Sequence, residues 1–397
     1  MTSAPSPARG ATWAPCAGIL LALGAIVMVQ PVFANIASTF GLPVVSVRVS
    51  FSYCSLAYAV AFFLLGPLTD RMPVSRMAAC CALGLATSVV LCGVSPSFRL
   101  FNLAMVLMGG CAAGVVSPLF PYMARIAPPG RAGAYLGLCL SATVTGIIFG
   151  RTLLGILTGL IGWRWAMIAY ALPVLLAAVA LFLAKSLPPL PGEKPSLSKQ
   201  YAAAIGLLTM PQVVRRYAAG FLLFFAYLGT LTFLTFYLGR PPFNLSVAQI
   251  GWISLAGGGG AGSAPKAGAL AHQYGVSRVV RAGVLLVLAS LLVLLVFDGI
   301  VAVVVGVLAL YTGVYACQPA VFYDVTTAIR PQQMGAASSL YLLSCLSGGS
   351  LGSYALGPIW QRWGWTGVMT AAGMAVLGTL VLGARGEGAP RLQRSEG

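Results

Sequence analysis

One arginine lies where an apolar helix is expected. Arg151 is about two-thirds of the way along an apolar stretch at 134–160, and no carboxylate shares its depth. A guanidinium inside a bilayer is costly unless it faces a partner or a water-filled cavity. Its planar fork of donors suits a carboxylate. The residue therefore indicates either a site for an anionic or strongly hydrogen-bonding substrate on a central path, or an arginine capped by carbonyl oxygens between helices.

Further polar or amphipathic side chains are predicted at membrane depth, where each needs a partner or water. Taken singly, each is better explained by helix packing or by an aromatic belt at the membrane interface. The candidates for the lining of a substrate path are Gln30, Asn35, Tyr53, Tyr58, Tyr227, Tyr237, Gln318 and Tyr323.

Titratable groups are scarce in the sequence, which has six acids and one histidine. Asp324 is the one candidate for proton coupling near the path, and His272 is expected to be a solvated loop residue rather than a proton relay. The scattered acids do not support a membrane enzyme, which needs clustered acid–base or metal-binding groups. Because the nine cysteines lack metal-type spacing, no metal site and no cofactor are predicted. The other acids are Asp70, Asp298, Glu193, Glu387 and Glu396.

The composition requires a lipid environment around these residues. Of 397 residues, 59% are hydrophobic and 7% are charged, which leaves too little polar surface for a water-soluble domain. A helical span needs about 20 apolar residues. The apolar runs do not alternate as in a β-barrel. Twelve transmembrane helices are predicted, at 14–36, 47–67, 76–94, 100–123, 134–160, 163–184, 216–238, 248–270, 279–297, 299–323, 335–358 and 364–383.

The positively charged residues are distributed unequally between the two sides of the predicted membrane. With the amino terminus in the cytoplasm, 17 of the 23 basic residues fall in the tails and loops on that side, whereas Arg48, Arg99, Arg164, Arg240 and Arg362 fall on the other. This bias predicts that both termini are cytoplasmic. It also explains the net charge of +17 without a nucleic-acid partner. The first apolar run is expected to be kept as a span rather than cleaved as a signal peptide.

The sequence repeats itself at an offset of 202 residues. Gly146, Gly150 and Gly155 match Gly348, Gly352 and Gly357, and the register holds without gaps over about 100 residues. Because each copy contains six spans, the copies are parallel repeats related by an axis along the membrane normal. The prediction is two six-helix bundles, at 1–184 and 216–397, joined by a proline-rich cytoplasmic linker at 185–215.

With these features the chain resembles the major facilitator superfamily over nearly its whole length. The strongest local similarity is to the superfamily's signature between helices two and three, carried here by Gly66, Asp70, Arg71 and Arg76. An acid and basic residues at helix ends can form a latch between helices. The resemblance implies such a gate on the cytoplasmic side. In the second copy, histidine and glutamine replace the acidic and basic pair, so the latch is expected to be asymmetric.

Helix five resembles the glycine-rich motif of the superfamily's exporters of drugs and metabolites. Its motif residues are Gly146, Gly150, Arg151, Gly155 and Gly159. Exporters usually have Gly-Pro where this sequence has Gly150-Arg151, a departure shared with some arabinose-efflux-permease-like members. The similarity favours export over import.

The resemblance implies a monomeric secondary active transporter in the bacterial inner membrane. It would export a small organic molecule, such as a drug, a metabolite or a siderophore, by alternating access coupled to proton antiport. Membrane lipid, the substrate and protons are the expected partners. The alternative is an importer or facilitator of a small organic anion or sugar, and facilitated diffusion or a substrate that carries its own proton stays open.

Overall fold

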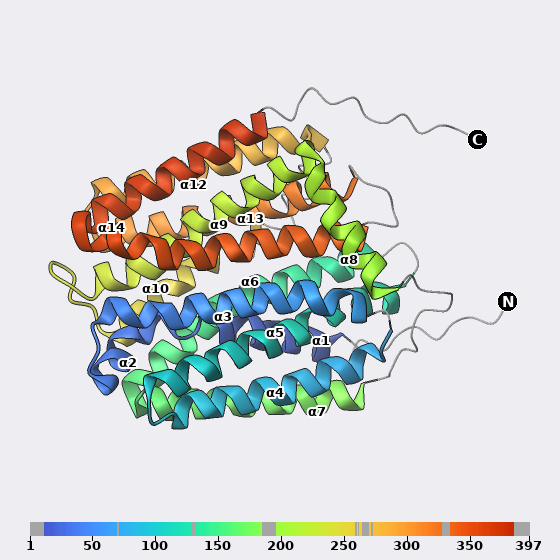
Figure 1. Cartoon of the computed structure of the whole chain (residues 1–397). Helices are drawn as coiled ribbons and strands as arrows, with labels where there is room; N and C mark the ends of the chain where they lie inside the picture. The colour runs from blue at the N-terminus through green and yellow to red at the C-terminus, as the bar shows by residue number, and fades with distance from the viewer. Residues whose placement is uncertain are drawn as a thin grey trace.

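The computed structural model of the chain is built from α-helices and short 3₁₀ turns, with no strand among the residues it describes, which are 12–69, 71–128, 132–184, 196–258, 260, 262–263, 270, 273–327 and 334–384. Figure 1 shows two groups of roughly antiparallel helices, α1 to α7 in one group and α9 to α14 in the other. The elements are α1 (Trp13–Val27), η2 (Gln30–Val32), α2 (Phe33–Phe40), α3 (Val44–Leu65), η3 (Gly66–Leu68), α4 (Val74–Val94), α5 (Phe98–Ile126), α6 (Ala132–Ile161), α7 (Trp163–Leu183), α8 (Leu197–Gly206), η4 (Leu207–Thr209), α9 (Pro211–Leu238), α10 (Val247–Ile253), η5 (Ser254–Gly257), α12 (Val276–Val296), α13 (Ile300–Thr327) and α14 (Met334–Ala384).

Ten helices among these residues are long and apolar enough to cross a membrane. One of them, Ser339–Leu382, covers the last two predicted spans, and the predicted span at 248–270 is described as the shorter apolar helix Val247–Gly257. Helices suit a bilayer because every backbone polar group is bonded within its own segment. The prediction of an all-helical membrane protein is confirmed.

Two glycines at equivalent positions turn the chain at the same end of the molecule. Gly162 separates α6 from α7 with a φ of 78°, and Gly364 lies inside α14 with a φ of 57°. A positive φ is unfavourable for residues with a Cβ atom. The chain therefore reverses at Gly364, so that α14 crosses the molecule twice (Figure 1). We call this end, where Gly162 and Gly364 lie, the turn end and the opposite end the tail end.

The repeat is visible in the packing as well. A Cβ atom at Gly146 or Gly150 would overlap the backbone of α1, and one at Gly348 or Gly352 would overlap the backbone of α9. Small residues allow helix backbones to approach closely. The fifth helix of each copy therefore packs on the first helix of its own copy through glycines at matching positions.

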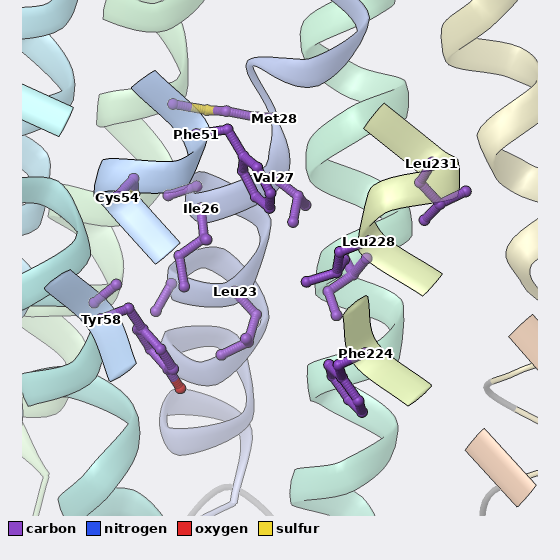
Figure 2. Close-up of a cluster of buried hydrophobic side chains, with 14 of the residues drawn as sticks. Leu23, Ile26, Val27, Met28, Phe51, Cys54, Tyr58, Phe224, Leu228 and Leu231 are labelled. Atoms are coloured by element: carbon purple, nitrogen blue, oxygen red, sulfur yellow. The ribbon is translucent and has the colours of Figure 1, made fainter. Parts of the chain in front are cut away.

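Apolar side chains fill the space where the two halves meet near the middle of the molecule. Figure 2 shows α1 between α3 on one side and α9 on the other. All of these side chains belong to one continuous buried core. The labelled members are Leu23, Ile26, Val27, Met28, Phe51, Cys54, Tyr58, Phe224, Leu228 and Leu231.

The predicted linker contains a helix of its own. α8 begins after Ser196, whose hydroxyl accepts a hydrogen bond from the Lys199 amide at 3.4 Å. The Tyr201 hydroxyl donates to the Leu64 carbonyl at 2.6 Å, and its ring packs on Phe63. The linker therefore contacts the tail end of α3, while its segment 185–195 lies outside the described residues.

Candidate functional site

Arg151 is buried in the middle of the molecule, with only 3% of its surface exposed. Its Nε donates to the Ser254 hydroxyl at 3.2 Å, and its Nη1 donates to the Gln30 side-chain oxygen. Both partners are neutral. Nη2 makes no hydrogen bond to the residues that the structure describes. The guanidinium therefore keeps a full positive charge and unused donor capacity in the protein interior.

The first partner is held by a break in the first span. Gln30 lies in η2, where Pro31 interrupts the α-helix between α1 and α2. Proline lacks the amide that would continue the helix. The Gln30 amide nitrogen donates to the Thr232 hydroxyl of α9 at 3.0 Å, and that hydroxyl donates to the Leu228 carbonyl at 2.8 Å. Gln30 and Thr232 are 202 residues apart, so equivalent positions of the two copies meet beside Arg151.

The second partner also lies where a span changes from α to 3₁₀ geometry. Ser254 is the first residue of η5, directly after α10. Its neighbourhood brings α6 and α10 very close, because the Thr152 hydroxyl donates to the Gly251 carbonyl at 3.0 Å and a Cβ at Gly155 would lie 3.0 Å from the Gly251 Cα. Short 3₁₀ stretches inside helices often mark hinges. Arg151 therefore joins the two halves at points where neither partner span is a regular α-helix.

Two tyrosines of the second half lie next to the guanidinium, and a third, Tyr315, packs on them. Tyr227 and Tyr311 interact electrostatically with Arg151. The Tyr227 ring meets Tyr311 edge-on at 5.2 Å and Tyr315 at 6.0 Å. All three side chains are buried, and the hydroxyl of Tyr227 interacts with those of Tyr311 and Tyr315. Buried polar groups are normally paired, so the three tyrosines form a small polar cluster beside the buried charge.

A small pocket opens beside Arg151 on the side of the second half. Its cavity volume is about 10 Å³, room for about one water molecule, and Arg151 is the one described residue of the first half that lines it. Apolar residues of α9, α10 and α13 form most of the wall, with Ser254, Thr235 and Tyr311 as the polar groups. The small space beside the guanidinium is therefore lined mostly by apolar side chains, with few polar groups near Arg151.

The other predicted lining residues lie elsewhere. Tyr58 is buried in the apolar seam against Phe62, and Tyr53 is 45% exposed on α3. Tyr237 donates to Asp298 at 2.8 Å and stacks on Trp365 at the turn end. Asn35 in α2 and Gln318 in α13 are half-buried. Among the candidates, the structure therefore brings together Arg151, Gln30 and Tyr227. The side chains of Tyr323 and Asp324 lie outside the described residues.

The predicted gate signature is described in part. Gly66 lies in η3, where a Cβ would be 3.0 Å from the Ser339 hydroxyl of α14, so the two halves touch there. Arg76 is exposed in the first turn of α4, and Arg71 is half-buried. Asp70 and His272 lie outside the described residues.

A second buried arginine was missed by the sequence analysis, which assigned it to the positive charges of a loop. Arg48 lies in the first turns of α3 and donates from Nε to the Ser353 carbonyl at 3.0 Å, from Nη2 to the Tyr354 carbonyl at 3.2 Å, and from Nη1 to the Val45 carbonyl. The space it occupies would be filled by a Cβ at Gly357. All three of its nitrogens are used, so Arg48 clamps α3 to α14 near the turn end.

Four further residues of the site were not predicted: Thr232, Ser254, Tyr311 and Tyr315. For two of them the repeat carried a signal, since Thr232 is 202 residues after Gln30 and Ser254 is 202 after Ser52. Polar residues at equivalent positions of two parallel bundles face the same central axis. The two tyrosines had no such signal.

Known proteins show the same fold and sequence pattern. The model of the Major Facilitator Superfamily matches residues 16–353. "Uncharacterized transporter YgaY" of Escherichia coli O157:H7 is 30% identical over 92% of this chain and 93% of its own length. "Inner membrane transport protein YnfM" of Escherichia coli K12 is 28% identical over 90% of this chain and 85% of its own length.

Among solved structures, the fold is similar to that of a bacterial homolog of the human lysosomal transporter Spinster in an inward-facing and unoccupied conformation. The TM-score is 0.71 at 16% identity, and the match covers 94% of this chain and 95% of that one. The human organic anion transporter MFSD10 has a TM-score of 0.70 at 20% identity, covering 95% and 99%. At these identities the structures establish the shared fold. The chain therefore belongs to the Major Facilitator Superfamily and is a multi-pass membrane transporter, not an enzyme.

Proposed function

We propose that this protein exports a small organic anion across the bacterial inner membrane by alternating access. The observation that carries the proposal is Arg151, a buried guanidinium at the edge of a pocket that has two neutral partners, and none at Nη2, in the described part of the chain. A buried charge without a counter-charge is strongly disfavoured. An anionic substrate would supply the missing charge at the moment of binding, and this gain in free energy is available only to an anion.

The position of Arg151 supports a role in the transport cycle. Its bond to Gln30 stays within the first half, whereas its bond to Ser254 crosses to the second half. In our proposal the bundles 1–184 and 216–397 rock about the site, with both termini in the cytoplasm. Rocking of the bundles would separate α6 from α10 and break the hydrogen bond between Arg151 and Ser254. Because the anion binds to the same guanidinium, its binding is linked to this movement.

Proton antiport is the proposed coupling, with Asp324 as the titrating group. Asp324 is on α13, the helix that also carries Tyr311 and Tyr315. Thirteen residues separate Asp324 from Tyr311, which corresponds to roughly 20 Å along a helix. Coupling over that distance acts through the movement of α13 rather than through direct contact with the substrate.

Inside-out vesicles containing the full chain test the function. Accumulation of labelled organic anions is measured under an imposed proton gradient for the wild type, Arg151→Ala, Asp324→Asn and, as a control, the exposed arginine variant Arg240→Ala. We expect gradient-driven uptake in the wild type and the control, and its loss in the other two. Uptake that persists in Arg151→Ala would contradict the site. Uptake that ignores the gradient would contradict antiport and indicate facilitated movement of the anion.

A further inference from the structure

We propose that the pocket beside Arg151 binds a single chloride ion when no organic anion is bound. This inference rests on the proposed function, because it names the inorganic ion that the substrate displaces from the same guanidinium. Three observations carry it: a buried positive charge without a counter-charge in the described part of the chain, a cavity with room for about one water molecule, and hydroxyls around that cavity whose own hydrogen bonds are long.

The charge of Arg151 is the argument for an anion rather than a water molecule. The side chain is buried, and its two partners, Gln30 and Ser254, are neutral. Of the six acids, only Asp298 has a described side chain, and it accepts a hydrogen bond from Tyr237 at the turn end. An unpaired buried charge is strongly disfavoured. A water molecule could accept a bond from Nη2 but would leave the charge uncompensated, whereas an anion supplies both the acceptor and the counter-charge.

The size of the cavity is the argument for an ion of one atom. Its volume is about 10 Å³, and a chloride ion is only slightly larger than a water molecule. A carboxylate or a phosphate carries two or more oxygens on a central atom, so it can reach the guanidinium only after the two halves move apart. Because most of the wall is apolar, the attraction between the ion and the guanidinium is weakly screened.

Three hydroxyls line the cavity together with the guanidinium, those of Thr235, Ser254 and Tyr311. The hydroxyls of Thr235 and Ser254 each donate to the carbonyl oxygen four residues earlier at 3.3 Å, which is longer than the usual length of about 2.7–2.8 Å. By contrast, Thr232 does not line the cavity and makes the same bond at 2.8 Å. The protons of Thr235 and Ser254 can therefore turn towards an anion at little cost.

A bound chloride ion has a consequence for the transport cycle. Without an anion, rocking of the two bundles would carry an uncompensated guanidinium through the apolar interior, which is costly. With chloride beside Nη2, the empty protein passes through the closed arrangement with its charge neutralised. An organic anion must then displace the chloride ion to bind. Chloride and the organic anion therefore compete for one positive charge.

Bromide diffraction and thermal unfolding of the purified full chain test the site without an organic anion. Wild-type crystals soaked in sodium bromide should show an anomalous peak beside Nη2 of Arg151. In lipid nanodiscs, replacing sulfate by chloride at constant ionic strength should raise the melting temperature by about 2 °C or more relative to Arg151→Gln in the same two salts. The exposed variant Arg240→Ala is the control for general salt effects and should respond as the wild type does.

A nearly isosteric pair of variants tests the hydroxyls, by titrating the melting temperature against the chloride concentration. Thr235→Val should weaken chloride binding by about three- to tenfold, which corresponds to one hydrogen bond. Thr379→Val is the matched control, because Thr379 is a buried threonine of α14 whose hydroxyl donates to the Ala219 carbonyl at 3.3 Å. Its chloride affinity should stay at the wild-type value. Equal weakening in both variants would contradict the role of the Thr235 hydroxyl.

The remaining outcomes separate the chloride site from the proposed function. Absence of a bromide peak at Arg151, or a chloride response that persists in Arg151→Gln, would overturn the chloride site. If calorimetry then shows organic anions binding to the wild type but not to Arg151→Ala, the proposed function stands without chloride. If no anion depends on Arg151, both proposals are wrong. A bromide peak at Arg151, together with an affinity for organic anions that falls as chloride rises, would support both, whereas an affinity independent of chloride would contradict the competition.

Discussion

Two interfaces between the halves are formed by equivalent helices of the repeat, yet the buried arginine at each interface has different hydrogen-bond partners. In the 202-residue repeat, α3 corresponds to α10 and α6 to the first part of α14, so the α6–α10 and α3–α14 interfaces are equivalent. Arg151 at the first donates to an amide and a hydroxyl and leaves Nη2 unused. Arg48 at the second donates from all three nitrogens to carbonyl oxygens.

The difference teaches that burial alone does not identify a binding arginine. Arg48 is saturated by the backbone near the turn end, and Gly357 provides its space, so it acts as a fixed clamp. At the equivalent Gly155 no side chain intervenes, and the α6 and α10 backbones touch. What distinguishes Arg151, the residue proposed to bind the anion, is unused donor capacity beside a pocket.

The largest expected effect comes from fixing either interface with a disulfide. A Cβ at Gly159 would lie 3.4 Å from the Ala248 Cβ, and one at Gly66 would lie 3.9 Å from the Ser339 Cβ. The second spacing lies within, and the first just below, the range of about 3.5–4.5 Å between the Cβ atoms of a disulfide. Oxidised Gly159→Cys/Ala248→Cys and Gly66→Cys/Ser339→Cys should each stop transport, and reductant should restore it. Uptake into vesicles measures transport, and variants with only one of the two introduced cysteines are the controls. Full transport by either cross-linked protein would show that its interface need not open.

Gln30→Glu should weaken anion binding by about tenfold or more, which corresponds to at least 1.4 kcal/mol. The new carboxylate would pair with Arg151 and compete with the substrate, and it should also raise the melting temperature by neutralising a buried charge. Calorimetry with an organic anion and thermal unfolding measure the two effects. Gln30→Met is the matched control without a charge, and an equal loss in both variants would mean that the amide, not the free charge, matters.

Arg48→Ala should act on stability rather than on binding. Removing the clamp leaves an empty space at Gly357 and unpaired carbonyl oxygens, at a cost of about 1–3 kcal/mol. Thermal unfolding should show the loss, while the affinity for an organic anion stays at the wild-type value. A drop in affinity comparable to that of Arg151→Ala would remove the distinction between the two arginines.

The smallest expected effect sharpens the contrast between the two glycines. Gly357→Ala meets the guanidinium of Arg48, whereas Gly155→Ala meets the backbone of Gly251 at 3.0 Å. Combining Gly357→Ala with Arg48→Ala should therefore be less destabilising than the sum of the single changes, by about 0.5–3 kcal/mol. When Gly155→Ala is combined with Arg48→Ala instead, the losses of stability of the two single variants should simply add. Melting temperatures of the single and double variants measure both.

Much of the fold could be predicted from the sequence, because apolar length, glycine spacing and the repeat are properties of the chain itself. The site could be predicted only in part. Arg151 was visible because a charge inside a span is rare, but its partners depend on breaks at Pro31 and Ser254 that decide where side chains point. Arg48 was missed because it lies one residue into a predicted span, where the sequence alone does not separate a buried clamp from a loop charge.

The bond between Gln30 and Thr232 has a consequence for symmetry. In a homodimer of identical six-helix units, the residue at the position of Gln30 would face its own copy. An arginine at 151 would likewise be matched by a second arginine at the position of Ser353. Two like charges would then share a central path. A single covalent chain escapes this constraint, because each half can change alone. Joining the halves is therefore what permits one guanidinium, and one orientation of an asymmetric ligand, at the centre of a nearly two-fold molecule.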